Sequence, residues 1–363
     1  MREQENHQMD TLPNRHVRIH VCAVSRMLRL GISAFVLITG LVLVSCLGPV
    51  TETRSASIFQ SQVVLTLRDH GSADTIEACF ARLRAIDAEM NMWDAGSELS
   101  RLNARAGQGA VAVSRDLLVT VERGLELARL TDGIFDPTVG PLVKLWGIGT
   151  DHARVPTEAE IHRAWRLVDW RRVTVDPAAG TVSLEPGQAL DFGALAKGYG
   201  AMEGARLLAS HGVRSAVLDV GGCVAVIGSG PRGAVWRVGV QEPGAARGTP
   251  LGVFALQDAI VDTSGVYERF FDSGGRRYAH IMDTRTGRPV ESDLVSATVA
   301  MPRDENADGP ALALLVLGRK AGLALADRLG LAVVLVGPNK TLYVSRAARG
   351  SFAVTDRSYT VVP

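Results

Sequence analysis

The segment 191–200, with the sequence DFGALAKGYG, constrains the fold of this chain more than any other. It predicts a strand that ends in Asp191, a tight glycine turn, and a helix with Lys197 in its first turn. Apolar residues continue at helical spacing until His211-Gly212, where a glycine would end the helix. Unpaired N–H groups at a helix start attract anions, and glycines let phosphates approach the backbone. The segment therefore predicts an anion-binding turn, although an ordinary strand–turn–helix with a solvated lysine has the same pattern.

The N-terminal segment has the features of a secretory signal. Arginines precede an apolar run at 30–44, which is shorter than the roughly 20 residues of a membrane-spanning helix. Because Cys46 follows small residues, the segment resembles a bacterial lipoprotein signal, in which this cysteine is lipidated; an uncleaved signal anchor is the alternative. We expect a signal peptide at 1–45, a tether at 46–58 and a folded domain at 59–363. The protein would then be lipid-anchored on the periplasmic side of the cell envelope.

Composition excludes several classes of function. The 363 residues include 39 Lys and Arg against 38 Asp and Glu, so no basic field points to nucleic acid. No Cys or His spacing indicates zinc. Helical and strand patterns alternate irregularly, and several strand pairs look antiparallel. The sequence therefore predicts an α+β fold, with mixed or antiparallel sheets covered by helices.

Periodicity locates the expected elements. Helices are expected at 74–90, 114–130, 157–170 and 307–329. Strands are expected at 61–68, 173–175, 181–184, 215–220, 234–240, 253–262, 295–300, 332–336 and 341–345. Asp74 and Glu77 form a plausible cap pair for the first helix, and Cys79 on its apolar side predicts a core thiol.

Two polar segments are candidates for ligand contacts. Trp93 follows a helix end within the segment MNMWDAGSELSRLN, where it could stack on a planar ring or plug the edge of the core. The segment TDGIFDPTVGPL at 131–142 has two glycines and two prolines, so it forms a stiff loop whose backbone groups need partners. Its aromatic and carboxylate side chains suit the edges of a ligand, and a purely structural loop remains the alternative.

His280 is the strongest acid–base candidate. Its side chain titrates near neutral pH, and Asp283 is close enough in sequence to orient the ring, although a lone histidine is often structural. Farther along, Asp308 lies at a predicted helix start, where it could bind a hard cation such as Mg²⁺ or only provide an N-terminal helix charge.

Taken in order, these segments resemble the ApbE family of FAD:protein FMN transferases, which are flavin-handling bacterial lipoproteins. The resemblance runs from about residue 60 to the C-terminus. It rests on the segments SELSRLN, FDPTVGPL, DFGALAKG, TSGVYER, HIMDTRTG and ADGPALAL. It implies a T-fold-like α+β architecture and transfer of FMN from FAD to a Thr or Ser hydroxyl of an acceptor protein, with release of AMP. The implied acceptor is a redox-complex subunit that carries a flavinylation motif.

The resemblance also assigns site residues. It implies FAD contacts from Trp93, Ile134, Phe135, Asp136, Asp191, Lys197 and Ile281. The carbonyl of Ala194 and the side chain of Asp308 would bind Mg²⁺, and His280 would be the catalytic histidine. Attack on a pyrophosphate requires charge neutralisation, which the metal and Lys197 would supply, and a base for the hydroxyl proton.

Several positions depart from the family pattern. Leu312 stands where the family has a metal-ligating Thr, and Pro310 lies in the same turn. The other departures are Cys223 for Asp, Val266 for Asp, Thr284 for Pro and, near the first strand, Phe59 for Met. Two alternatives therefore stay open: a FAD-binding lipoprotein with little or no transfer, and a Mg²⁺-dependent FAD pyrophosphatase that gives FMN and AMP. Restoring the Thr at Leu312 would separate transfer from simple binding.

Overall fold

The computed structural model describes residues 51–69, 72–303 and 309–362. The chain divides into two units, Met1–Gly48 and Pro49–Pro363, and the described residues belong to the second. The signal peptide predicted at 1–45, the predicted lipidation site Cys46 and the predicted metal ligand Asp308 lie outside the described residues. Among the described helices, none has both the length and the apolarity that crossing a bilayer requires.

The central feature is a nine-stranded sheet, counted over the described residues, with the order β1-β2-β6-β7-β10-β15-β16-β17-β19. All neighbouring strands are antiparallel except β17 and β19. The strands are β1 (Glu52–Ile58), β2 (Ser61–Leu67), β6 (Ser215–Val220), β7 (Cys223–Gly228), β10 (Ala259–Gly265), β15 (Ser296–Pro302), β16 (Ala332–Gly337), β17 (Thr341–Val344) and β19 (Thr360–Val362).

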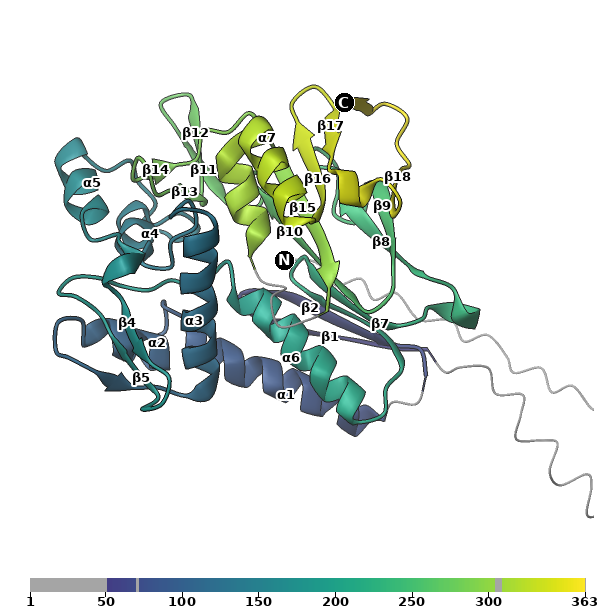
Figure 1. Cartoon of the computed structure of the whole chain (residues 1–363), viewed down its shortest axis with the longest axis horizontal. Coiled ribbons are helices and arrows are strands. Elements are labelled where there is room, and N and C mark those ends of the chain that lie inside the picture. Colours follow the sequence, from purple (N-terminus) through teal and green to yellow (C-terminus); the bar gives the residue numbers. More distant parts are fainter. Residues whose placement is uncertain (1–50, 70–71, 304–308, 363) are drawn as a thin grey trace, which may run out of the picture. The chain divides into compact units, whose positions relative to one another are not determined.

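The central strands of this sheet, such as β15 and β16, are buried on both faces, whereas edge strand β1 is mostly exposed. Helices α1 (Ala73–Met90), α6 (Ala196–Ser210) and α7 (Pro310–Leu329) pack on one face, and α1 lies beside α6 (Figure 1). A small sheet of β8 (Trp236–Gln241), β9 (Pro250–Leu256) and β18 (Phe352–Val354) covers the other. Strand β16 shows the alternation: Val333 and Leu335 belong to the core with the helices, whereas Val334 and Val336 belong to the core with the small sheet. This accounts for its uninterrupted apolar sequence.

The segment between α1 and α6 forms a second group of elements (Figure 1). It contains α2 (Glu98–Ala104), α3 (Arg115–Leu130), α4 (Gly140–Trp146), α5 (Glu158–Trp165) and a sheet of β3 (Val111–Ala112), β5 (Thr181–Ser183) and β4 (Thr174–Asp176). Two hairpins follow β10, namely β11 (Phe270–Ser273) with β12 (Arg276–Ala279), and β13 (Met282–Asp283) with β14 (Arg288–Pro289). Single 3₁₀ turns occur at Trp170–Arg172, Pro231–Gly233 and Arg346–Ala348.

Helix boundaries follow local chemistry. Ser72, Ser97, Ser114 and Thr157 each cap a helix by accepting a backbone N–H bond. Helix α6 differs, because it begins after Leu195 with no side-chain cap. It also packs very closely on the sheet, since a Cβ on Gly204 would lie 2.6 Å from Leu218 Cδ2. Among the described helices, α4, α6 and α7 all begin without a side-chain cap.

The α+β class is confirmed, as is the hairpin predicted at 173–184, and Cys79 is a buried core residue. The tether predicted at 46–58 is wrong for Glu52–Ile58, which forms edge strand β1 paired with β2. Most of its side chains are exposed, so its sequence has no apolar alternation to mark it.

Four further predictions about helices and strands were wrong. The strand predicted at 253–262 is two strands in different sheets, separated by a turn at Asp258, which has a φ of 43°. The helix predicted at 157–170 ends at Trp165, and the first helix is capped by Ser72 in place of the Asp74–Glu77 pair. In the described chain no strand ends at Asp191; an isolated bridge between Val139 and Ala189 stands where the strand was predicted.

Candidate active site

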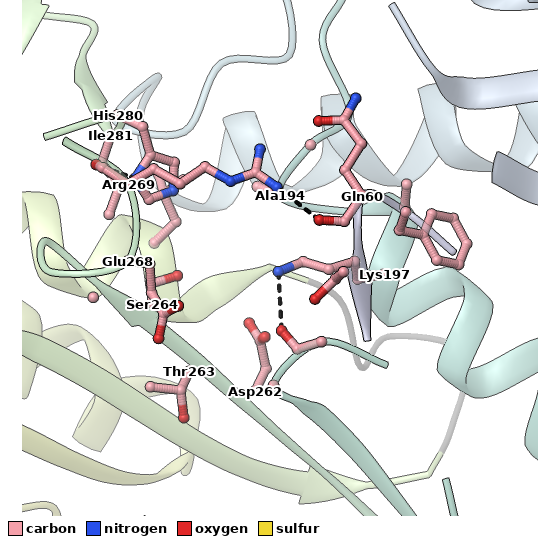
Figure 2. A pocket seen from close by; sticks show the side chains of 18 of the residues that line it. Gln60, Ala194, Lys197, Asp262, Thr263, Ser264, Glu268, Arg269, His280 and Ile281 are labelled. Carbon is pink, nitrogen blue, oxygen red and sulfur yellow. Dashed lines mark hydrogen bonds between the residues drawn. The ribbon is translucent and has the colours of Figure 1, made fainter. Parts of the chain in front are cut away.

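A cavity of about 690 Å³ opens beside the start of α6. Every sequence-predicted site residue that the structure describes lines it: Trp93, Ile134, Phe135, Asp136, Asp191, Ala194, Lys197, His280 and Ile281. Leu312, at the position of the missing Thr, lines it as well. Figure 2 shows part of this wall, with Lys197, Asp262, Arg269 and His280 directed toward the interior. Segments far apart in the sequence thus meet around one space.

The loop 131–142 and the turn at 191–193 are built together. Asp191 N–H donates to the Pro137 carbonyl at 2.9 Å, and Gly140 N–H donates to the Ala189 carbonyl at 3.1 Å. The approach is so close that a Cβ on Gly140 would lie 2.6 Å from the Ala189 oxygen. Only glycine fits at this position. The two segments therefore reach the cavity as one rigid wall.

Asp136 belongs to the support of that wall. Its side chain is 6 % exposed, and Oδ1 accepts hydrogen bonds from Thr138 N at 2.8 Å and Thr138 Oγ1 at 2.6 Å. Its Oδ2 accepts from Trp170 N at 3.1 Å. Burial raises the pKa of this carboxyl, and these bonds act in the opposite direction. The carboxylate holds the loop, so any contact with a ligand would come from the backbone or from neighbours such as Phe135.

Trp93 lies in the turn between α1 and α2. Its side chain is 44 % exposed, so it does not plug the core edge. Its backbone N–H donates to Asn91 Oδ1 at 3.0 Å, which fixes the turn at the cavity rim. An exposed indole beside a cavity offers a face on which a flat ring can stack.

Lys197 and three carboxylates are among the charged groups that line the cavity. Lys197 Nζ donates to the Gly221 carbonyl at 3.3 Å. Burial raises the pKa of the carboxyls of Asp191, Asp219 and Asp262. The Lys197 charge lowers the pKa of Asp219 and Asp262, so the ammonium group acts on both. The cavity is therefore lined by the Lys197 cation and by three carboxyl groups that burial makes harder to ionise.

His280 is held by a single backbone oxygen. Its N–H donates to the Arg269 carbonyl at 3.0 Å, and ring Nδ1 lies 3.2 Å from the same oxygen. A carbonyl can only accept, so Nδ1 carries the hydrogen and Nε2 is the unprotonated nitrogen. Burial lowers the pKa of His280 from 6.5 to about 4, and the charges of Arg269 and Lys197 act in the same direction. The ring is therefore neutral at pH 7, with Nε2 able to accept a proton.

The expectation that Asp283 orients His280 is wrong. The Asp283 carboxylate pairs with Arg285 instead, with Oδ2 at 2.7 Å from Nη2 and Oδ1 at 2.9 Å from Nε. It also accepts from the Arg285 backbone N–H at 2.9 Å. This side chain closes the β13–β14 hairpin, which follows His280, and does not contact the ring.

The metal site that the family resemblance implies lies only partly within the described residues. Ala194 lines the cavity, Asp308 lies outside the described chain, and Leu312 contributes an apolar wall. Within 51–69, 72–303 and 309–362, no group of three or more His, Cys, Asp or Glu residues could hold a metal ion. The described part therefore supplies a carbonyl oxygen but no carboxylate cluster for a cation.

Sequence reasoning missed other residues of the wall, notably Asp219, Asp262, Glu268 and Arg269. A signal was present for two of them. Asp219 interrupts the apolar run of β6, and Asp262 ends the apolar run of β10. Burying a carboxylate costs free energy unless it is paired or hydrogen-bonded, so such a residue in a buried strand suggests a function. Arg269 follows β10 in a loop, where no periodicity marks it.

Comparisons with known proteins agree with this geometry. The model of the ApbE family matches residues 57–335. The chain is 35 % identical over 297 residues to a FAD:protein FMN transferase of Treponema pallidum, covering 78 % of this chain and 80 % of that protein. It is 33 % identical over 258 residues to one of Vibrio cholerae, covering 70 % and 76 %.

Solved structures show the same architecture. The flavin transferase ApbE from Vibrio cholerae superposes with a TM-score of 0.74 at 29 % identity, covering 83 % of this chain and 100 % of that one. The ApbE protein of Thermotoga maritima gives a TM-score of 0.77 at 25 % identity, covering 83 % and 99 %. The family match spans most of the chain, and the two sequence relatives align over most of their own length. This chain is a member of the ApbE family.

Proposed function

We propose that this protein transfers FMN from FAD to a Thr or Ser hydroxyl of an acceptor protein and releases AMP. One observation carries the proposal. The cavity gathers the described residues predicted to bind FAD around His280, whose Nε2 is the proton-accepting nitrogen. The relatives from Treponema pallidum and Vibrio cholerae are FAD:protein FMN transferases.

The proposed transfer forms one phosphorus–oxygen bond and breaks another. The acceptor oxygen attacks the phosphorus on the FMN side of the diphosphate, and the bond from that phosphorus to the bridging oxygen breaks. AMP leaves with the bridging oxygen, and the hydroxyl proton passes to His280 Nε2. A ring held neutral by a low pKa is ready to take that proton at pH 7. The phosphoanhydride of FAD supplies the driving force, so ATP is not required.

The start of α6 would bind the diphosphate. This helix has no side-chain cap, and its first N–H, that of Ala196, donates to the Phe192 carbonyl at 2.8 Å. The anion would be attracted by the positive end of the helix and by Lys197, which adds a full positive charge in the first turn. The Lys197 ammonium makes only a long hydrogen bond of 3.3 Å to Gly221, which phosphate oxygens could replace.

Mg²⁺ dependence is a further part of the proposal. The Ala194 carbonyl and the Asp308 carboxylate would hold the ion, since Mg²⁺ prefers oxygen ligands. Gly309, which follows Asp308 in sequence, packs against Leu195, which follows Ala194. A Cβ on Gly309 would lie 2.6 Å from Leu195 Cδ2. When bound, the ion would offset the negative charge of the diphosphate. Leu312 adds no oxygen, so we expect weak Mg²⁺ binding.

The cellular setting is proposed from the N-terminal sequence. Lipidation of Cys46 would anchor the protein on the periplasmic side of a bacterial membrane, where acceptor subunits of redox complexes would be reached. Radiolabelled fatty acid should enter the wild type and not Cys46→Ala. Equal labelling of both proteins would contradict the anchor.

The experiment that tests the function is a mass measurement. The purified full chain is incubated with FAD, Mg²⁺ and an acceptor domain, and the acceptor is weighed by mass spectrometry. We expect a gain of one FMN and an equal amount of AMP. The apolar Leu312 favours a second candidate, FAD binding with little transfer, which would leave FAD intact. Free FMN and AMP without a change in the acceptor would indicate a pyrophosphatase.

A further inference from the structure

Arg269 spans the cavity from the loop between β10 and β11. Its Nη2 lies 3.4 Å from the backbone carbonyl of Gln60, in the turn between β1 and β2 (Figure 2). Its side-chain stem passes Gly149, where an added Cβ would lie 3.4 Å from Arg269 Cδ. A guanidinium has several N–H donors, and 3.4 Å is longer than a normal N–H···O bond. Most of its donor capacity is therefore available to a ligand.

The positive charge of Arg269 acts on two titratable groups of the cavity, the Asp191 carboxyl and the His280 ring. Burial raises the pKa of the Asp191 carboxyl, and the Arg269 charge opposes this rise; burial lowers the pKa of the His280 ring, and the Arg269 charge adds to this fall. Lys197 likewise acts on His280. Two cations, one from α6 and one from the β10–β11 loop, thus face the space beside the imidazole. No carboxylate of the described residues forms an ion pair with either of them within 4.0 Å.

The backbone of the same residue fixes the base. The Arg269 carbonyl accepts from both the backbone N–H and ring Nδ1 of His280, at 3.0 and 3.2 Å. A ligand anion drawn to the guanidinium would therefore be brought next to Nε2 of that ring. Arg269 would therefore bind the anion with its side chain, and its carbonyl sets the tautomer of His280.

We infer that Arg269 binds the phosphates of FAD, exchanging its long contact with Gln60 for charge-assisted hydrogen bonds to the diphosphate beside His280. The inference rests on the proposed function, since it takes FAD as the substrate. Arginine suits this task because its planar fork matches two phosphate oxygens at once. Lysine keeps the charge but not the fork.

The test uses a series of flavins that differ only in phosphate content. Dissociation constants of the full chain for riboflavin, FMN and FAD are measured by flavin fluorescence for wild type, Arg269→Ala and Arg269→Lys. We expect Arg269→Ala to weaken FAD and FMN about 10- to 100-fold, and to change riboflavin less than about 2-fold. Arg269→Lys should recover part of the loss.

Arg277→Ala is the matched control. Arg277 lies on β12 of the adjacent hairpin, is exposed, pairs with Asp272 and does not line the cavity. The Arg277→Ala protein should bind riboflavin, FMN and FAD with the dissociation constants of the wild type. Unchanged riboflavin binding also shows that Arg269→Ala remains folded.

Each other outcome is decisive. If Arg269→Ala binds FAD as tightly as the wild type, the inference is overturned while the proposed function stands. If it loses riboflavin and FAD equally, Arg269 shapes the cavity and does not bind phosphate. A wild type with no affinity for FAD would refute the proposed function itself.

Discussion

Two acidic residues of the same cavity wall differ sharply in how their oxygens are used. Asp136 accepts hydrogen bonds from Thr138 and Trp170 through both oxygens, at 2.6 to 3.1 Å. Asp191 receives a single side-chain hydrogen bond within the described residues, from Gly193 N at 3.0 Å. The same resemblance marks both as FAD contacts, yet one carboxylate is occupied by its own loop. Bonds within the protein therefore separate residues that support the cavity from residues that face its contents.

This comparison divides the cavity into a supporting side and a ligand-facing side. Asp136 and its partners form the supporting side; Asp191, Lys197, Arg269 and His280 form the ligand-facing side. Substitutions on the first should change the free energy of unfolding, and substitutions on the second should change binding or turnover.

The largest effect is expected at His280. His280→Ala removes the proton acceptor, so the transfer rate should fall about 10²- to 10⁴-fold, while the dissociation constant for FAD changes little. Single-turnover mass spectrometry of the acceptor measures the rate. His152→Ala, an exposed histidine away from the cavity, should transfer normally. A His280→Ala protein with wild-type turnover would place the base elsewhere.

Lys197 should affect binding without affecting stability. Lys197→Met removes a charge that the phosphates would contact, so the FAD dissociation constant should rise about 10- to 100-fold. The midpoint of urea unfolding should stay near that of the wild type, because the amine makes only a 3.3 Å bond to Gly221. Loss of stability with intact FAD affinity would move Lys197 to the supporting side.

Asp136 should show the reverse. Asp136→Asn places an amide donor against N–H donors, so the free energy of unfolding should fall by about 1–3 kcal/mol. Urea denaturation measures this loss. FAD titration of the folded variant should show a smaller change than Lys197→Met does. A large loss of FAD affinity at unchanged stability would mean that the carboxylate itself faces the ligand.

Leu312→Thr tests the proposed Mg²⁺ site at the edge of the ligand-facing side. A hydroxyl there offers Mg²⁺ an oxygen ligand, so the Mg²⁺ concentration for half-maximal transfer should fall several-fold. Leu312→Val is the control, since valine has the shape of threonine without the oxygen. Identical Mg²⁺ dependence of the two variants would show that position 312 takes no part in metal binding.

The smallest expected effect is a flat pH profile. Because burial lowers the pKa of His280 to about 4, the free protein keeps a neutral base down to that pH. The ratio kcat/KM should change less than about 2-fold between pH 5.5 and 7.5. A half-loss near 6.5 would contradict this. Between about pH 4 and pH 6.5 the unfolded chain binds more protons at His280 than the folded chain does, so the contribution of His280 to the free energy of unfolding rises with pH.

The sequence predicted much of the fold, and the described residues that it predicted for the site all line one cavity. Long amphipathic helices such as α3 and the β4–β5 hairpin have strong local signals. Strand β1 has none, because it is an exposed edge strand whose pairing alone defines it. The strand predicted at 253–262 hid a turn, since apolar residues continue on both sides of Asp258.

The support of His280 could not be predicted from local sequence. Asp283 is near in the chain, but hairpin β11–β12 pairs Phe270 with Ala279 and so brings the Arg269 carbonyl to the ring. The contact between Arg269 and Gln60 joins residues 209 positions apart. Such contacts depend on sheet order, which no periodicity encodes.

A crystal structure of the full chain with FAD bound tests the central claim most directly. The account predicts the diphosphate at the start of α6, with Lys197 and Arg269 on its oxygens and His280 Nε2 facing the space where an acceptor hydroxyl would attack. Phosphates bound away from α6, or a His280 ring turned from the phosphorus on the FMN side, would contradict it.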